Sequence, residues 1–448
     1  MIMDWKKLIT SKRLGQESRH SERHDDRSEF KRDYDRLIFS APFRRLQNKT
    51  QVFPLPGSVF VHNRLTHSLE VASVGMSLGN DVAHSLMQRQ PELREVPLFP
   101  QIGTIVSSAC LAHDMGNPPF GHSGEKAIQA FFREGPGSDL QREVSPAFWD
   151  DVTHFEGNAN TFHLLTHRFK GRREGGFVMT YSMLASIVKY PCSSSAAGDK
   201  GKFGFFDVDR ANYQRIAEEM GISCLSQLGE PLRYVRHPLV YLVEAADDIC
   251  YEIMDIEDAH KLRILTYAET EDLLLGFFNE EERQHILKRI VDEGIDDDNE
   301  KVVYLRSRVI GLLENECAAV FCNYENEILA GTFQGSLIEH ITDIPRQAYK
   351  ACAELSKQKI YRSKPVLDVE LSGFRIIETL METMIEAAVH PDRFYSRQII
   401  QRVSSQYDIN STDLQTRIMA MIDYITGMTD VFALDIYQKI KGLSLPIV

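Results

Sequence analysis

Apolar residues recur at steps of three and four along most of this chain. Such spacing places them on one face of a helix and predicts amphipathic helices. The pattern is clearest in five stretches, residues 67–90, 104–113, 239–260, 302–331 and 414–440. Strict alternation of apolar and polar residues, which predicts strands, is short and rare. We therefore expect an all-α protein.

Three stretches interrupt this helical pattern. Residues 50–61 place Val and Phe on both sides of Pro-Leu-Pro-Gly, which favours a short hairpin or an extended pair. Residues 191–204 are rich in Ser and Gly and predict a loop, either a mobile flap or an ordinary surface loop. Residues 12–36 mix many charges of both signs, which suits a solvated arm or an arm that contacts another subunit.

Composition narrows the class of protein. A chain of 448 residues with 43% hydrophobic residues can bury a large core. The net charge of -13 argues against a protein dedicated to coating nucleic acid. The seven cysteines are scattered and form no Cys-x-x-Cys pair, which argues against a disulfide framework or a structural zinc site. Neither a membrane-spanning apolar run nor an N-terminal signal segment is evident, so we expect a cytoplasmic protein without a membrane partner.

The most informative segment for chemistry is 111–122, Leu-Ala-His-Asp-Met-Gly-Asn-Pro-Pro-Phe-Gly-His. His113 and Asp114 are adjacent, and an imidazole with a carboxylate is half of a divalent metal site. The pair alone fits equally well with two polar residues at the surface end of a helix. The Gly and Pro residues that follow end the helix and turn the chain, so His122 should return close to the pair.

Two further residues are candidates to complete a metal site. His67 opens an apolar-periodic helix, where a histidine is otherwise a packed core residue. Asp247 lies in a helix that looks buried, and a buried carboxylate is costly without a cation or hydrogen bonds. The alternative is that Asp247 and Asp248 form a solvated polar stripe on this helix. Helical spacing puts Asp247, Tyr251 and Asp255 on one face.

The order His67, His113–Asp114, Asp247 resembles the H…HD…D signature of the HD-domain metal phosphohydrolases. Longer motifs resemble one group within that superfamily, the bacterial dGTP triphosphohydrolases, over residues 10 to 260 and more weakly to Tyr437-Gln-Lys-Ile-Lys-Gly-Leu-Ser-Leu-Pro. These motifs are Phe43-Arg-Arg-Leu-Gln-Asn-Lys-Thr-Gln-Val-Phe-Pro-Leu, Asn63-Arg-Leu-Thr-His-Ser-Leu-Glu-Val, His113-Asp-Met-Gly-Asn-Pro-Pro-Phe-Gly-His-Ser-Gly-Glu, Phe155-Glu-Gly-Asn-Ala-Asn and Glu244-Ala-Ala-Asp-Asp-Ile.

The resemblance implies an HD-domain helical core with a helical C-terminal extension. We expect an N-terminal arm and substrate-contact segment at 1–60, the HD core at 61–275, and a helical region at 276–448 that packs on the core and is not independent. It also implies a homo-oligomer, often a hexameric ring, with a dNTP or single-stranded DNA as effector.

The implied reaction is metal-dependent hydrolysis of dGTP or other dNTPs to deoxynucleoside and inorganic triphosphate. One divalent ion is expected per site, Mn²⁺ or Mg²⁺ first, with Fe²⁺, Ni²⁺ or Co²⁺ as alternatives. The implied ligands are His67, His113, Asp114 and Asp247.

His122 and Glu125 lie three residues apart and share a face if a helix starts here. A histidine oriented by a carboxylate is a common general acid or base. The alternative is a helix-start histidine followed by a Glu that the helix dipole favours. The resemblance makes His122 and Glu125 the catalytic pair.

Substrate contacts are also implied by the resemblance. Arg64, one helical turn before His67, would grip phosphate oxygens. Lys189 and Tyr190 are further phosphate candidates, while Lys202 and Arg210 fit equally well as surface charges.

The sugar contacts are implied in the same way. Tyr251 would stack on the deoxyribose and leave no room for a 2′ hydroxyl. Asp255 would accept a hydrogen bond from the 3′ hydroxyl, and Gln51 would lie beside the sugar.

Other readings remain open at the level of sequence. Another HD phosphohydrolase, such as a 5′-nucleotidase or a phosphodiesterase, would share the metal ligands. A non-catalytic nucleotide sensor or single-strand nucleic-acid binder would share the fold. His163 and His167 have the spacing of a metal pair, but we interpret them as packing or surface residues because the HD set is already complete.

Overall fold

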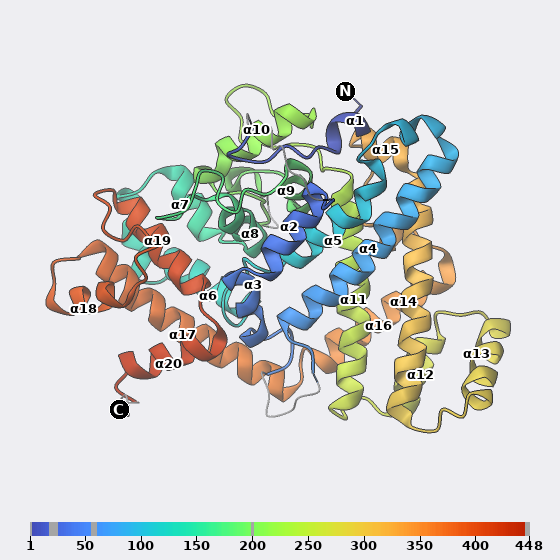
Figure 1. Cartoon of the computed structure of the whole chain (residues 1–448). Helices are drawn as coiled ribbons and strands as arrows, with labels where there is room; N and C mark the ends of the chain where they lie inside the picture. Colours follow the sequence, from blue (N-terminus) through green and yellow to red (C-terminus); the bar gives the residue numbers. More distant parts are fainter. Residues whose placement is uncertain (1, 18–25, 55–60, 199–200, 444–448) are drawn as a thin grey trace.

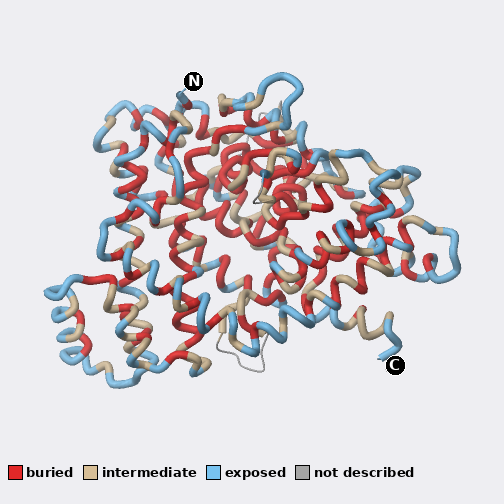
Figure 2. The backbone as a smooth tube through the Cα atoms, turned by 180° about the vertical axis from the view of Figure 1, so that it is seen from behind, coloured by how far each residue is buried: buried red, intermediate tan, exposed pale blue. Residues whose placement is uncertain are grey.

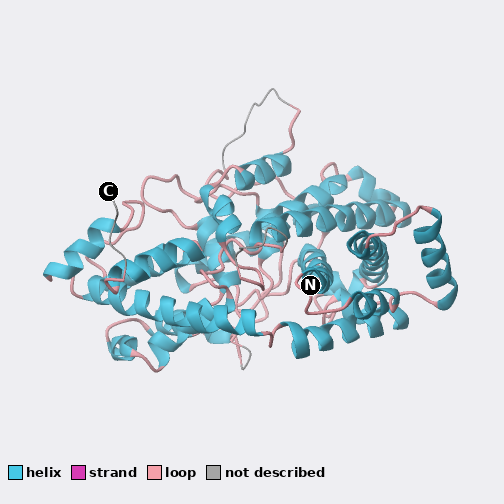
Figure 3. Ribbon diagram, turned by 90° about the horizontal axis from the view of Figure 1, so that it is seen from below, coloured by secondary structure: helices cyan, strands magenta, loops and turns pink. Residues whose placement is uncertain are grey.

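The computed structural model describes residues 2–17, 26–54, 61–198 and 201–443 (Figure 1). Helices make up all the regular secondary structure in these ranges, and loops connect them (Figure 3). β-Pairing in the same ranges is limited to isolated bridges, such as the one between Thr50 and Asn63. The prediction of an all-α protein is confirmed.

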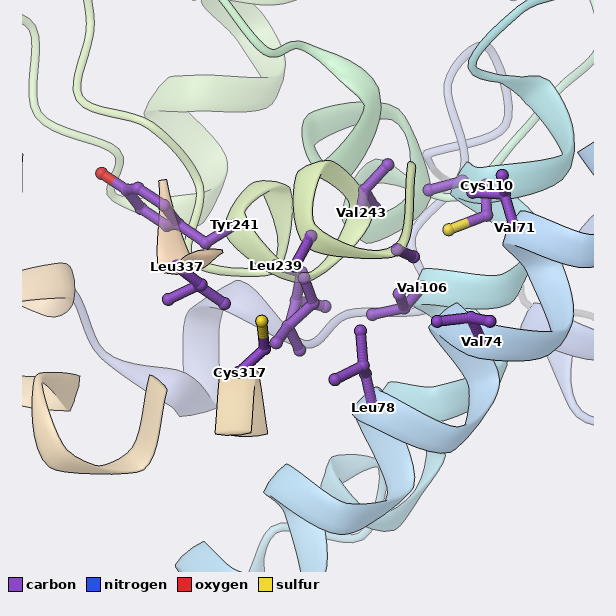
Figure 4. Packing of buried hydrophobic residues seen from close by; sticks show 14 of the residues in the cluster. Val71, Val74, Leu78, Val106, Cys110, Leu239, Tyr241, Val243, Cys317 and Leu337 are labelled. Carbon is purple, nitrogen blue, oxygen red and sulfur yellow. The ribbon is translucent and has the colours of Figure 1, made fainter. Parts of the chain in front are cut away.

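Three helices form the centre of the fold: α4 (Arg64–Arg89), α5 (Ile102–Ala112) and α11 (Leu239–Lys261). Val71, Val74 and Leu78 of α4 lie against residues of α5 and α11 (Figure 4). Helices α4 and α5 approach closely because Gly79 faces Gly103, where an added Cβ would lie 2.6 Å from the Gly103 Cα. Chain entry into α4 is set by a capping box between Asn63 and Thr66.

Other helices surround this centre. On the N-terminal side and around the site they are α1 (Trp5–Leu8), α2 (Glu29–Ile38), α3 (Ala41–Arg45), α6 (His122–Arg133), α7 (Pro146–Thr153), α8 (Gly157–Thr166), α9 (Tyr181–Ile187) and α10 (Arg210–Met220). After α11 come α12 (Tyr267–Leu275), α13 (Glu280–Asp292), α14 (Asp298–Asn323), α15 (Glu325–Ala330), α16 (Asp343–Leu355), α17 (Lys364–Val389), α18 (Phe394–Arg402), α19 (Leu414–Thr426) and α20 (Asp430–Ile440).

Two of the predicted helices are interrupted. The periodic stretch 302–331 breaks at Tyr324, between α14 and α15. The stretch 414–440 breaks between α19 and α20, where the Thr429 side chain accepts a hydrogen bond from the Phe432 backbone N–H and starts a new helix. Apolar spacing continues across both breaks, so periodicity alone does not reveal them.

Buried apolar residues form two clusters. The larger one joins α4, α5, α9, α11 and α14, and the second joins α6, α17 and α19. Helix α17 contributes Val366 to the first and Ile376 onward to the second, so it connects the two. Buried backbone segments concentrate in the middle of the molecule, and exposed ones gather at its outer ends (Figure 2).

The described part of 12–36 is not a solvated arm. Arg13 is 5% exposed and forms ion pairs with the buried Asp33 and with Glu29. Phe30 and Leu37 of α2 enter the main core. Arg13 and Asp33 therefore neutralise each other inside the fold, whereas Arg27 and Lys31 of the same segment are exposed.

Two further expectations fall partly on residues 55–60 and 199–200, which lie outside the described ranges. The hairpin expected at 50–61 is represented only by the Thr50–Asn63 bridge at its ends. The loop expected at 191–204 is a loop, but Cys192 and Phe203 anchor it in the core, so its described part is not a free flap. No helix of the described ranges is both long and apolar enough to cross a membrane.

Candidate metal and phosphate site

The segment between α5 and α6 carries the adjacent His–Asp pair. Helix α5 ends at Ala112, His113 and Asp114 follow at once, and His122 starts α6. The intervening turn includes Phe120 at φ 60° and Gly121 at φ 55°. This turn returns His122 toward the pair, as the Gly and Pro residues predicted.

His67, His113 and Asp247 bring three ligand atoms within 4.8 Å of one another. The Asp247 Oδ1 atom lies 3.1 Å from His67 Nε2 and 3.5 Å from His113 Nε2. His113 Nδ1 donates to the Cys110 carbonyl at 2.6 Å, which directs Nε2 into the group. That Nε2 is buried and has no hydrogen-bond partner in the described ranges. Two imidazoles and a carboxylate, one of whose imidazole nitrogens has no partner, fit a divalent ion.

Asp114, the fourth expected ligand, lies at the edge of this group. Its Oδ1 is 3.7 Å from His113 Nε2. Its Oδ2 accepts a hydrogen bond from Arg64 at 2.6 Å, and the Asn117 amide donates to Oδ1. The structure therefore places Asp114 between His113 and Arg64, the candidate phosphate-binding residue.

The charges of these groups depend on one another. Burial opposes ionisation of Asp247, but the imidazoles of His113 and His67 outweigh it and hold its pKa well below the usual range. Burial also opposes a charge on His113, yet Asp114 and Asp247 raise its pKa to about 9. The carboxylates thus create a field that attracts positive charge. A metal ion would supply that charge and would replace the protons on the imidazoles.

His122 and Glu125 form the expected pair at the start of α6. His122 Nδ1 lies 3.1 Å from Glu125 Oε2, and the His122 side chain is 67% exposed, whereas that of Glu125 is 8% exposed. The other Glu125 oxygen accepts the Gly157 backbone N–H at 2.8 Å. Glu125 is thus fixed and orients an imidazole that remains accessible.

A cavity of about 300 Å³ connects these groups. Its lining includes three cations, Arg64, Lys189 and Lys202, of which Lys189 pairs with Glu244 at 3.2 Å and Lys202 pairs with Glu156. Eight of the twelve predicted site residues line it: Arg64, His113, Asp114, His122, Glu125, Lys189, Tyr190 and Asp247.

The three predicted sugar contacts do not line this cavity. Tyr251 and Asp255 follow Asp247 along α11, as their spacing predicted. The Asp255 carboxylate is buried and accepts a hydrogen bond from the Tyr361 hydroxyl at 2.8 Å. Burial raises its pKa well above the usual range. The side-chain oxygen of Gln51 is buried and has no hydrogen-bond partner in the described ranges.

Sequence reasoning gave no role to three residues that the structure places in contact with predicted ones. Asn117 lies within the motif at 113–125, and Glu244 precedes Asp247 by about one helical turn. The positions of both residues in the sequence could therefore have indicated that they lie near the site. Tyr361 comes from a distant segment, and nothing in its sequence surroundings indicated a contact with Asp255.

Comparison with known proteins agrees with this geometry. Residues 343–439 match the family model described as a phosphohydrolase-associated domain. Proteins named deoxyguanosinetriphosphate triphosphohydrolase-like are similar over their whole length. That of Pseudomonas aeruginosa (strain LESB58) is 37% identical, that of Synechocystis sp. 34% and that of Listeria monocytogenes 33%, each over 99% of this chain and 100% of the relative.

Full-length identity at this level, together with the His/Asp group and its cation-lined cavity, identifies the family. The chain belongs to the deoxyguanosinetriphosphate triphosphohydrolase-like proteins, a family of phosphohydrolases.

Proposed function

We propose that this protein hydrolyses deoxynucleoside triphosphates, dGTP or other dNTPs, to deoxynucleoside and inorganic triphosphate. The observation that carries the proposal is one cavity with metal donors, cations and an accessible histidine. The donors His113 and Asp247 line the cavity, and His67 lies beside them. The accessible histidine is His122, which contacts Glu125. The family names of the relatives agree with this reaction class.

His67, His113, Asp247 and the adjacent Asp114 would hold one divalent ion. The buried, unpartnered Nε2 of His113 fits such an ion, and the mixed imidazole and carboxylate donors suit Mn²⁺ or Mg²⁺, with Fe²⁺, Ni²⁺ or Co²⁺ as alternatives. When bound, it supplies Lewis-acid polarisation of a phosphoryl oxygen.

The protein's own side chains bind and orient the triphosphate. Arg64 is buried beside the metal group and can contact phosphate oxygens through its second terminal nitrogen. Lys189 and Lys202 extend the positive lining away from it, with Tyr190 beside them. Each of these cations would be shared between a phosphate oxygen and its carboxylate partner, Asp114, Glu244 or Glu156.

Proton transfer falls to His122. Water attacks the α-phosphorus and the bond from phosphorus to the 5′ oxygen breaks. His122 donates a proton to that oxygen as it leaves, the proton of the attacking water passes to solvent, and Glu125 holds the imidazole in position. Tyr251, Asp255 and Gln51 lie outside the lining of this cavity, so their contacts with a deoxyribose stay a prediction from the family resemblance.

The test is incubation with each dNTP and Mn²⁺, followed by chromatographic separation of products. We expect deoxynucleoside and triphosphate. Deoxynucleoside monophosphate with pyrophosphate would refute the mechanism, and a nucleoside monophosphate or cyclic nucleotide as sole substrate would favour another phosphohydrolase.

A pair of variants isolates the proton donor. His122→Ala should keep metal binding and lose at least about 100-fold in kcat. His84→Ala, at an exposed histidine of α4, is the matched control and should keep full activity. Full activity in His122→Ala would remove the catalytic assignment, and binding of dNTPs without any turnover would favour a sensor.

The predicted homo-oligomer, its hexameric state and a dNTP or single-stranded DNA effector stay predictions.

A further inference from the structure

A second cavity, of about 310 Å³, lies on α8 between the core and the C-terminal helices. His163 and His167 line it, together with Phe206 and with Tyr407 and Asp423 of the C-terminal region. It shares no lining residue with the cavity at His113. Figure 1 shows the two regions that it joins, around α8 and α19.

His163 is fully buried between two carboxylates. Its Nδ1 lies 2.7 Å from Asp209 Oδ2, and its Nε2 lies 3.4 Å from the Asp423 carboxylate. Asp209 and Asp423 are themselves buried. Buried carboxylates require a compensating positive charge, so this group needs a cation, whether a protonated imidazole or a metal ion.

His167 lies one helical turn after His163, with ring centroids 4.4 Å apart and an interplanar angle of 32°. No side chain in the described ranges forms a hydrogen bond with its ring nitrogens. An imidazole with an unengaged nitrogen, beside a second imidazole and a carboxylate, can serve as a metal ligand.

We propose that His163, His167 and Asp209 form a second metal site, for Zn²⁺ or a similar transition-metal dication. Their ligand atoms lie within 4.8 Å of one another. The ion would replace the proton on His163 Nδ1, while Nε2 donates its hydrogen to Asp423 and fixes the ring. Two imidazoles and one carboxylate leave a coordination position that faces the cavity.

The consequence of this site is a link between distant segments. Asp423 belongs to α19, inside the phosphohydrolase-associated segment, whereas His163 and His167 belong to α8 and its C-terminal cap. A bound ion would fix the imidazole that pairs with Asp423 and so hold the C-terminal region on the core. The inference does not depend on the proposed reaction.

The experiment counts ions on the full-length protein. Chelator-stripped protein is dialysed against Zn²⁺, and bound metal is measured by mass spectrometry. We expect two ions per chain in the unmodified protein and one in His167→Ala. In a His113→Ala background, which weakens the first site, His167→Ala should again remove one ion. Co²⁺ loading of His113→Ala should give visible d–d absorption that the double variant lacks.

His84→Ala controls for loss of any histidine, and circular dichroism checks that each variant is folded. Zn²⁺ should also raise the melting temperature of His113→Ala and not that of the double variant. Equal Zn²⁺ content with and without His167, in both backgrounds, would overturn the proposal. His163 would then be only a protonated imidazole held between two carboxylates.

Discussion

Gly373 of α17 offers a sharp test of how the C-terminal region controls the site. It is buried against Phe120, two residues before His122. A Cβ added at Gly373 would lie 2.5 Å from the Phe120 Cβ and Cγ atoms. The perturbation is therefore Gly373→Ala, which adds one methyl group far along the chain from the predicted catalytic pair.

The magnitude follows from this distance. Carbon atoms in contact lie about 3.5–4.0 Å apart, so Phe120 must move by about 1 Å or more. Its Cβ cannot swing away as a side-chain end can, and its backbone N–H is held by Asp430 at 2.9 Å. The turn to His122 should therefore shift. A displacement of about 1 Å at a reacting group costs on the order of 100-fold in rate. Overpacking costs about 1–3 kcal/mol, offset by about 1 kcal/mol of helix propensity.

The assay measures kcat for dNTP hydrolysis and the free energy of unfolding in urea. We expect Gly373→Ala to lose about 10- to 100-fold in kcat and up to about 2 kcal/mol of stability. Gly311→Ala is the matched control, since it is also inside a helix and a Cβ there meets nothing within 4 Å. It should keep its activity and gain up to about 1 kcal/mol. If both variants behave alike, the contact does not position the turn.

Three further outcomes are expected. Dialysis against EDTA should abolish dNTP hydrolysis, and added Mn²⁺ should restore it; full activity in chelator would exclude a metal requirement. Glu125→Gln should lower kcat about 10- to 100-fold with an unchanged melting temperature, because His122 loses the charge that orients it; unchanged kcat would remove that role. Burial raises the pKa of Asp151 to about 8, so its contribution to stability is complete below about pH 4 and is lost as the pH rises through 8. Asp151→Asn should therefore be more stable relative to the unmodified protein at about pH 9 than at about pH 6 in thermal melts; the opposite trend would contradict the assignment.

Much of the site was predictable because its residues lie in short motifs with helical spacing. His113 and Asp114 are adjacent, His122 and Glu125 lie one turn apart, and Arg64 precedes His67 by one turn. Such local relations hold whatever the helices pack against. The structure brings His113, His67 and Asp247 together because α4, α5 and α11 pack in one core.

Contacts between distant segments were not predictable in the same way. Tyr361 reaches Asp255 across 106 residues, and Asp423 reaches His163 across 260. His163 and His167 were interpreted as packing or surface residues because the HD ligand set was already complete. Their spacing gives no sign of Asp209, which comes from a separate segment and contacts His163.

Apolar periodicity and the order of the His and Asp motifs were sufficient for the helical class and the family, and they indicated the candidate donor residues, because helix formation and metal chemistry depend on local spacing. Packing in three dimensions settled the rest. It buried the Arg13–Asp33 pair of the charged N-terminal segment and placed Asp114 between Arg64 and His113. It also set α17 against the turn that precedes His122 and left Tyr251 and Asp255 outside the cavity at His113. These outcomes depend on which helix faces meet, and many faces of similar polarity can meet until the whole chain excludes the alternatives.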